Sequence, residues 1–244
     1  MPKFFVNRED IGQDYITISG SDARHLTNVL RKNVNDDIIV CDGCGFDYDA
    51  VITSVGDGCV NLKISDRRKN DCESDINVTV YQAVPKGDKM ETVIQKCTEL
   101  GAYGFVPFIN SRVVVKGDSK SFLKKRDRWQ KIADEAVKQC MRGRIPNVSE
   151  VLSFDKMLET ASKHKLCIMP YECCRDTRLK DALGSGIVDD IGIIIGSEGG
   201  FSEEETEKAR SFGIIPVTLG KRILRTETAG AAVLACTMYH MDRF

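Results

Sequence analysis

Hydrophobic residues in the first 65 positions occur in short, β-branched runs that Gly, Asp and Asn turn residues separate. This alternation is typical of β-strands joined by tight turns. The expected strands are residues 4–6, 15–18, 37–40, 48–52 and 60–64. One stretch departs from the pattern, because Leu26, Val29 and Leu30 recur at helical spacing after Ser21, which can cap a helix. The pattern therefore predicts a small β-barrel with one helix.

A uniformly polar stretch, residues 66–75, is expected to be a linker, and the pattern changes after it. Continuously apolar runs now alternate with segments of helical periodicity, which predicts a parallel sheet covered on both faces. The expected strands are 78–84, 105–109, 166–169, 191–195 and 214–219, and the expected helices are 88–103, 119–142, 154–163, 177–183, 203–212 and 226–241. We therefore expect two domains, residues 1–70 and residues 75–244, the second of the α/β class.

The segment 196–205, GSEGGFSEEE, follows an expected strand and begins an expected helix. It therefore lies at the carboxyl edge of the sheet, where ligands bind in such folds. Ser202 and Glu205 form a capping-box pattern. No G-x-G-x-x-G or P-loop lysine is present, and the glutamates at 203–205 compensate the helix dipole as a phosphate would. The loop suits a neutral or cationic ligand, and a plain chain-reversing turn is the alternative.

Two further segments are expected at the same edge. Residues 219–234 combine a basic loop, with Arg222 and Arg225, and a helix of small residues; the arginines can hold a phosphate or a developing anion. Residues 169–172, MPYE, follow another strand. Because loops after three strands reach one edge, we expect a ligand pocket there, although a solvated basic loop and a simple turn remain alternatives.

Basic residues are concentrated in residues 116–144, which contain 10 Lys or Arg against 4 Asp or Glu. The whole chain carries a net charge of −1, so attraction for nucleic acid must come from a local surface of this kind. Arg24, Arg31 and the run 67–69 can extend that surface, and a solvated helix face is the alternative. Trp129 falls on the apolar side of its helix and is expected in the core.

Composition limits the class of protein further. The 244 residues are 42% hydrophobic and 29% charged, which excludes a disordered polyelectrolyte and a collagen-like chain. We expect a soluble, cytoplasmic protein, because the N-terminus has no apolar signal segment and no stretch is long enough to span a membrane. Cys41 and Cys44 form the one C-x-x-C among ten cysteines, and we expect reduced thiols and no metal. The three scattered histidines give no hydrolase triad.

Residues 195–205 followed by 219–229, LGKRILRTETA, resemble the paired signature of the bacterial ribosomal RNA small subunit methyltransferase E family. Shorter matches follow in order along nearly the whole chain: residues 2–6, 25–26, 29–31, 86–90, 99–101, 111–112 and 129–132, Gln139, Arg142 and Pro146. Asn110 and Cys140 depart from the residues that many relatives carry, and the Cys41/Cys44 pair is individual to this chain. None of these departures touches the expected ligand loops.

The resemblance implies a SPOUT-type knotted parallel-sheet methyltransferase domain, preceded by a small PUA-like β-barrel that binds RNA. It implies a homodimer that binds S-adenosylmethionine in a trefoil knot, although general topology rules argue against knots. This methyl donor is a sulfonium cation without phosphate, in agreement with a glycine loop beside glutamates. The implied donor contacts are Met169, Pro170, Tyr171, Ile195, Gly196, Glu198, Gly199, Gly200, Leu219, Gly220, Ile223, Leu224, Arg225, Thr228 and Ala229.

The implied reaction is methylation of N3 of one uridine of 16S ribosomal RNA, expected to be uridine 1498, on the assembled small subunit. N3 carries an imide proton, so the enzyme must stabilise the anion that forms when this proton leaves. Arg225 is the first candidate, then Arg8 and Arg112, with Glu227 or Glu198 as base or organiser. The expected RNA contacts are Arg24, His25, Arg31, Arg112, Arg142, Arg144 and Arg222. Two alternatives remain: methylation of another rRNA or tRNA nucleotide, and a catalytically silent RNA-binding assembly factor.

Overall fold

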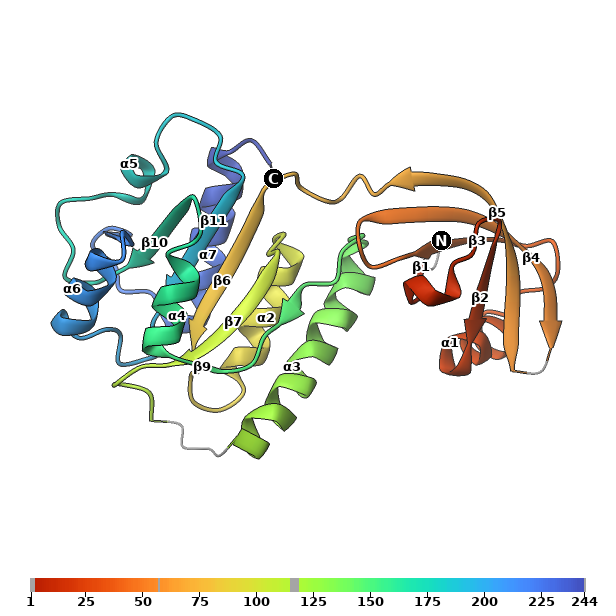
Figure 1. The fold of residues 1–244 in the computed structure, drawn as a ribbon, viewed down its shortest axis with the longest axis horizontal. Helices are drawn as coiled ribbons and strands as arrows, with labels where there is room; N and C mark the ends of the chain where they lie inside the picture. The colour runs from red at the N-terminus through yellow and green to blue at the C-terminus, as the bar shows by residue number, and fades with distance from the viewer. Residues whose placement is uncertain (1–2, 57, 115–118, 244) are drawn as a thin grey trace. The chain divides into compact units, whose positions relative to one another are not determined.

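The computed structural model describes residues 3–56, 58–114 and 119–243 (Figure 1). The chain forms two compact units. The first contains Met1–Glu73 together with Val137–Ile145, and the second contains Ser74–Ala136 and Pro146–Phe244. The first unit therefore includes a short segment from within residues 75–244, the range expected to form the second domain.

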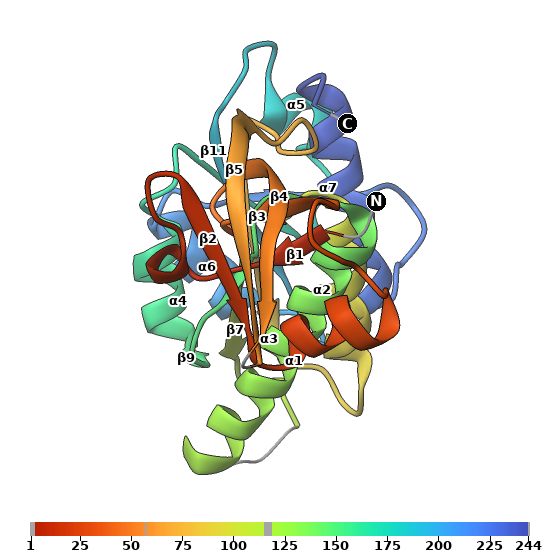
Figure 2. The same cartoon turned by 90° about the vertical axis from the view of Figure 1, so that its right-hand side faces the viewer.

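The first unit is built on a five-stranded sheet in the order β1-β3-β4-β5-β2 (Figure 2). β1 pairs with β3 in parallel and the other pairs are antiparallel. Alternate strand residues point into one apolar core, which also holds Ala23 and Leu26 of the helical segment after β2. The strands are β1 Lys3–Phe5, β2 Tyr15–Ser19, β3 Asp37–Cys41, β4 Phe46–Gly56 and β5 Cys59–Lys69; the helical turns are η1 Arg8–Asp10, α1 Gly20–Arg24 and η2 His25–Val29.

The predicted start of the linker at residue 66 is wrong, because β5 continues to Lys69. Residues 66–69 pair with residues 46–49 of β4. Cross-strand contacts explain why charged residues form a strand here: Arg67 lies over the ring of Phe46 at 4.1 Å, and Arg68 forms an ion pair with Asp49. The polar composition of this segment was therefore a misleading indication of a loop.

Glu73 attaches the segment 137–145 to the first unit. Its carboxylate accepts hydrogen bonds from Arg142 Nε (3.1 Å) and Nη2 (3.0 Å), and from the backbone N–H groups of Gly143 (2.8 Å) and Arg144 (2.9 Å). The side chains of Arg142 and Glu73 are only 5% and 7% exposed. Removing one partner would leave a buried charge without compensation, so this ion pair is a structural element of the unit.

The second unit contains a parallel sheet in the order β12-β10-β11-β6-β7-β8, with β9 pairing β7. The two shortest strands, β8 and β9, were not expected from the sequence because two residues give no periodic signal. The strands are β6 Asn77–Ala83, β7 Gly104–Ile109, β8 Asn147–Val148, β9 Leu152–Ser153, β10 Leu166–Pro170, β11 Asp190–Ile195 and β12 Ile215–Val217.

Helices cover both faces of this sheet, as the sequence predicts (Figure 1). On β11, Ile193 packs in the cluster that includes residues of α2, α3 and α7, whereas Ile194 packs in the cluster of α4 and α6. Trp129 is 5% exposed in the first cluster, which confirms it as a core residue. The helices are α2 Lys89–Glu99, α3 Ser119–Cys140, α4 Phe154–Ala161, α5 Leu179–Leu183, α6 Glu203–Ser211 and α7 Thr226–His240. None of the helices in the described ranges has the length and apolar character needed to cross a membrane.

Candidate functional site

Four neighbouring strands of the second unit end at one edge of the sheet. Because β12, β10, β11 and β6 are adjacent and parallel, their carboxyl ends and the loops that follow lie together. The loops that begin at Tyr171, Gly196 and Thr218 are the three that the sequence analysis assigns to one pocket. The turn after β6, which leads into α2, is a fourth segment at the same edge.

Gln82, near the end of β6, connects two of these segments. Its side chain is fully buried, and its Nε2 lies 2.9 Å from Thr226 Oγ1 and 3.3 Å from the carbonyl oxygen of Gly196. The Thr226 hydroxyl in turn donates to the Gly196 carbonyl at 2.6 Å. This buried network fixes the start of the glycine loop, residues 196–200, against the first residue of α7.

The glycine loop makes close contacts that exclude side chains at two positions. Ser197 and Gly200 close a tight turn through a Gly200 N–H to Ser197 C=O hydrogen bond of 2.9 Å, with Gly200 at φ +65°. A Cβ at Gly200 would lie 2.7 Å from Glu172 Oε1, and one at Gly196 would lie 3.1 Å from the Gly200 Cα. Backbone conformation therefore favours glycine at position 200, and crowding favours it at position 196.

Glu205 fixes the segment that follows the glycine loop. It is 8% exposed and completes the predicted capping box with Ser202. Its carboxylate also accepts from the Ser111 N–H (2.8 Å) and from Asn110 Nδ2 (3.0 Å), which follow β7. Although burial opposes ionisation, the hydrogen bonds from Ser202, Ser111 and Asn110 hold the pKa of Glu205 below its usual value. Glu205 is therefore a bridge between two loops, whereas Glu203 and Glu204 are exposed on the first turn of α6.

At the N-terminus of α6, Ser202 and Glu205 satisfy each other's backbone N–H groups, and the carboxylates of Glu203 and Glu204 lie on the same turn. This concentration of negative charge supports the sequence argument against a phosphate ligand. Arg112 adds a further constraint, since its Nη1 donates to the Gly199 carbonyl at 2.7 Å.

Three charged side chains from different segments meet beside the glycine loop. The Nζ of Lys89, the first residue of α2, lies 2.7 Å from Glu198 Oε1 and 3.9 Å from Glu227 Oε2. Glu198 also accepts from the Lys86 N–H at 3.2 Å. Partial burial opposes ionisation of Glu198, but the hydrogen bond from Lys89 and the backbone N–H bonds hold its pKa below the usual value. We call Lys89, Glu198 and Glu227 the ion cluster.

Several buried polar atoms at this edge have no hydrogen-bond partner among the described residues. They are Gln82 Oε1, Asn110 Oδ1, Ser197 Oγ and Glu227 Oε2. Buried polar atoms are rarely left unpaired, and they indicate a ligand or ordered water. Their concentration around the glycine loop marks it as the candidate binding site.

The other expected donor contacts differ in exposure. Met169, Ile195 and Ala229 are buried in the core, and Leu219 and Leu224 are half-buried against it. Pro170 and Tyr171 are half-buried at the end of β10, and Gly220 and Thr228 are exposed. Ile223 is 85% exposed, so in the single chain its side chain faces solvent.

Arg225 immediately precedes α7 and is exposed. Within the described residues, its guanidinium has no ion pair or side-chain hydrogen bond, so it is available to a substrate. Arg222 is exposed in the same loop. The structure therefore brings Arg225 and Glu227 to the edge that carries the glycine loop.

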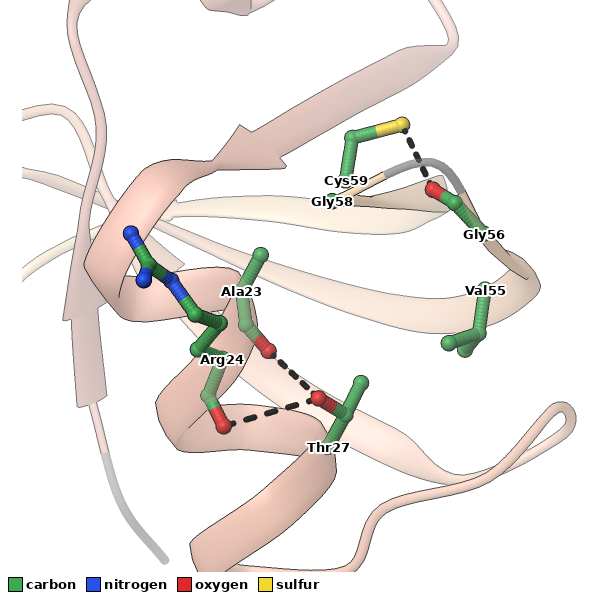
Figure 3. Close-up of a pocket in the computed structure, with 7 residues that line it drawn as sticks. All are labelled: Ala23, Arg24, Thr27, Val55, Gly56, Gly58 and Cys59. Atoms are coloured by element: carbon green, nitrogen blue, oxygen red, sulfur yellow. Dashed lines mark hydrogen bonds between the residues drawn. The ribbon is translucent and has the colours of Figure 1, made fainter.

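Arg8, the third candidate for catalysis, is exposed in η1 of the first unit. Arg24, His25 and Arg31 are exposed around the helical segment of that unit. Arg24 lines a small hollow between this segment and the end of the β4–β5 hairpin, in which Thr27 donates to the Ala23 carbonyl (Figure 3).

Arg142 was expected to contact RNA, but in the structure its side chain is buried within the first unit. Its guanidinium is buried on Glu73, so the RNA interpretation of Arg142 is replaced by a structural role. Arg144 is half-buried beside it. Lys116 and Asp118, which the sequence analysis counted in the basic stretch, lie outside the described residues.

Cys41 and Cys44 differ in environment. Cys41 is buried, its Sγ donates to the Gly143 carbonyl, and burial raises its pKa to about 12, whereas Cys44 is exposed. Over the described ranges, no group of three or more His, Cys, Asp or Glu side chains is arranged to hold a metal ion. Cys41 is therefore a packed thiol of the first unit.

The sequence analysis missed Gln82, Lys89 and Asn110 as site residues. Gln82 gave a usable signal, because a polar residue inside the apolar run of a buried strand needs a buried partner. Asn110 was expected to lie away from the ligand loops, but its Nδ2 donates to the Gly200 carbonyl at 3.1 Å, so that expectation was wrong. Lys89 lies in the 86–90 match to the family, but no local pattern indicated its partners, since both carboxylates are more than 100 positions away.

Sequence comparison agrees with this geometry. The sequence model of the RNA methyltransferase domain family matches residues 72–238, and that of the RNA methyltransferase PUA domain matches residues 18–65. The fold and the site thus define an RNA methyltransferase domain preceded by a PUA domain, which confirms the expected α/β fold class with a PUA-like N-terminal domain.

Individual relatives indicate which family of RNA methyltransferases the chain resembles. Ribosomal RNA small subunit methyltransferase E of Bacillus subtilis (strain 168) is 38% identical over 93% of this chain and 90% of its own length. The Synechocystis enzyme of the same name is 32% identical over 96% of this chain and 76% of its own length. A crystal structure of the Neisseria gonorrhoeae enzyme of that name, bound to S-adenosylmethionine, matches with a TM-score of 0.83 at 31% identity, covering 98% of this chain and 97% of that one. The chain belongs to the ribosomal RNA small subunit methyltransferase E family.

The bridging role of Glu205 predicts a pH-dependent loss of stability in Glu205→Gln. Because the pKa of Glu205 is lowered in the folded state, its contribution is fully present above the ordinary value of 4.5 and is lost as the pH falls through the lower folded value. We expect the variant to lose about 1.5–3 kcal/mol of unfolding free energy at pH 7. Denaturant titrations from pH 7 to pH 3 measure this difference.

The control is Glu204→Gln, which removes an exposed charge from the same helical turn and should change stability by less than about 0.5 kcal/mol. The wild type and Glu205→Gln should converge at low pH. A difference that stays constant with pH would contradict a role for the ionised carboxylate.

Proposed function

We propose that this protein transfers a methyl group from S-adenosylmethionine to N3 of one uridine of 16S ribosomal RNA, uridine 1498, on the assembled small subunit in the cytoplasm. Support comes from the relatives named above and from the S-adenosylmethionine-bound Neisseria structure. The observation that carries the proposal in this chain is the glycine loop, held between Gln82 and Glu205 beside two carboxylates at the carboxyl edge of the sheet.

The residues present at this edge suit S-adenosylmethionine. Gly196 and Gly200 allow close approach to the backbone, and the unpaired Ser197 Oγ can bind a polar group. The first turn of α6 is capped by Ser202 and carries three glutamates, which disfavours the pyrophosphate of a dinucleotide there. Glu198 and Glu227 supply negative charge, which suits a cation.

When bound, the donor supplies an activated methyl group on a positively charged sulfur. The uracil N3 is a weak nucleophile until its imide proton leaves, and the resulting anion spreads over O2, N3 and O4. The free guanidinium of Arg225 can stabilise this anion through hydrogen bonds to the carbonyl oxygens. Glu227, two residues further on, is the group we assign to accept the proton.

Arg8, in the first unit, is the second arginine that we assign to the developing anion. For the RNA itself, we propose contacts from Arg24, His25 and Arg31 of that unit, and from Arg112 and Arg222 of the second. Half-buried Arg144 can reach RNA from the edge of its segment. We base these assignments on the positions of the residues in the sequence and, for all except Arg144, on the exposure of their side chains. Phosphate contacts of this kind give affinity without reading sequence.

We also propose that the donor site lies within a knot. The Tyr171 N–H donates to the Val217 carbonyl, and the Thr218 N–H donates to the Thr177 carbonyl. Successive residues of an extended strand point their backbone groups to opposite sides, so the connection from β10 to β11 passes around the end of β12. The chain continues from β12 to α7, which packs on β11 and β6. A connection that passes around the end of a neighbouring strand is rare, and it supports the knot implied by the resemblance.

We propose that two copies associate through the outer face of α7. Thr228, Ala232, Ala235, Cys236 and Tyr239 follow one another at helical spacing on this face. Tyr239 is 80% exposed, and Ile223, just before the helix, is 85% exposed. Large apolar side chains with this exposure in a small-residue surface favour close helix packing between copies.

Tyr239→Glu should therefore yield single chains where the wild type sediments at twice the mass of the chain. Tyr15→Glu is the control, since Tyr15 is an exposed aromatic of the first unit, at 56%. Sedimentation equilibrium of a wild type that stays monomeric at all concentrations would contradict the homodimer.

Arg225→Ala should lower kcat for methyl transfer to small subunits by about 100–1,000-fold, because one preorganised donor to a developing anion is lost. The affinity for S-adenosylmethionine should change much less, and Arg225→Lys should retain part of kcat. Incorporation of radioactive methyl groups into uridine measures the rate, and calorimetry measures donor binding.

Arg210→Ala is the matched control, because Arg210 is an exposed arginine of α6 paired with Glu207. Near-normal methylation by Arg225→Ala would remove Arg225 from the reaction. A wild-type protein that binds S-adenosylmethionine but modifies no uridine would favour methylation of another nucleotide, whereas one that does not bind S-adenosylmethionine would favour the silent assembly factor.

A further inference from the structure

The ion cluster contains one positive and two negative charges. One ammonium, Lys89 Nζ, lies between two carboxylates, at 2.7 Å from Glu198 and 3.9 Å from Glu227. The ammonium belongs to α2, one carboxylate to the glycine loop and the other to the first turn of α7. The three groups therefore carry a net charge of −1 at the point where these segments meet.

This charge is partly shielded from water. The side chains of Lys89, Glu198 and Glu227 are 34%, 30% and 21% exposed, and Glu227 Oε2 is buried without a hydrogen-bond partner among the described residues. Charges in such positions act more strongly than those in bulk water. Lys86, Arg112 and Arg225 carry nearby positive charges, but all three are exposed and screened by solvent.

The unbalanced charge matters because the donor and its product differ by one charge. S-adenosylmethionine carries a positive sulfonium, and loss of the methyl group leaves S-adenosylhomocysteine with a neutral thioether. A local charge of −1 attracts the first compound more than the second, whereas hydrogen bonds to the shared adenosine and amino-acid groups do not distinguish them. A preference for the donor limits inhibition by the product, because the two compounds compete for the same site.

We propose that the ion cluster discriminates the methyl donor from the spent product by charge, and that Lys89 is the residue that sets the degree of discrimination. The inference rests on the proposed function, since it requires S-adenosylmethionine at this edge. Lys89 also limits the repulsion between Glu198 and Glu227 and keeps both beside the glycine loop.

Equilibrium binding without RNA tests the inference separately from catalysis. Calorimetry gives Kd for S-adenosylmethionine and for S-adenosylhomocysteine, and the ratio of the two measures discrimination. Lys89→Met changes the cluster charge to −2 and should raise the preference for the donor by about tenfold. Glu227→Gln changes the charge to 0 and should lower the preference by about tenfold. Lys89→Arg keeps the charge and should keep the ratio, even if both affinities change.

Lys165→Met is the matched control for the loss of one ammonium. Lys165 precedes β10 at the opposite edge of the sheet and forms an ion pair with Asp189 of the same length, 2.7 Å. The ratio of the two Kd values measured for Lys165→Met should equal that of the wild type. Glu227→Gln keeps the Lys89–Glu198 contact and the shape of the side chain, so it tests the inference even if Lys89→Met unfolds.

Opposite shifts of the ratio in Lys89→Met and Glu227→Gln would support the inference. An unchanged ratio in Glu227→Gln, or shifts of both variants in the same direction, would overturn it while leaving the proposed function intact. A folded wild-type protein that binds neither compound would contradict the proposed function itself, and the inference with it.

Discussion

Gln82 places one buried amide between the Gly196 carbonyl and the Thr226 hydroxyl, and the arrangement of the whole candidate site depends on that contact. The glycine loop and α7 are separated by an entire helix and strand in sequence, and this network joins them. Because the amide is fully buried, a change in the position of either partner would leave polar atoms unpaired. The constraint therefore fixes the loop, and with it Glu198, relative to Arg225 and Glu227, which flank Thr226.

The carboxylates around the loop have separate roles. Glu205 is buried and bridges the loops that follow β7 and β11, whereas Glu198 and Glu227 share the ammonium of Lys89. One carboxylate thus stabilises the backbone, and two give the site its charge. This division separates the carboxylate that joins the loops from the two that give this edge of the sheet its negative charge.

The sequence predicted the strands and helices of the second unit well, because long apolar runs such as residues 191–195 leave little ambiguity. The two-residue strands and the extension of β5 through Arg67 and Arg68 were missed, since they depend on cross-strand partners. The same limit applies to the site. The loops could be assigned to one edge, but the contacts of Lys89 and the burial of Arg142 on Glu73 come from residues distant in sequence. Local patterns carry no record of such pairs.

The central claim is that this edge of the sheet methylates a single uridine of the small-subunit RNA. The most direct test is mass mapping of modified uridines in ribosomal RNA from cells with and without the gene for this protein. The account predicts that one N3-methyluridine of 16S ribosomal RNA disappears and returns when the wild-type gene is restored. An unchanged set of methylated uridines in the deletion strain would contradict it.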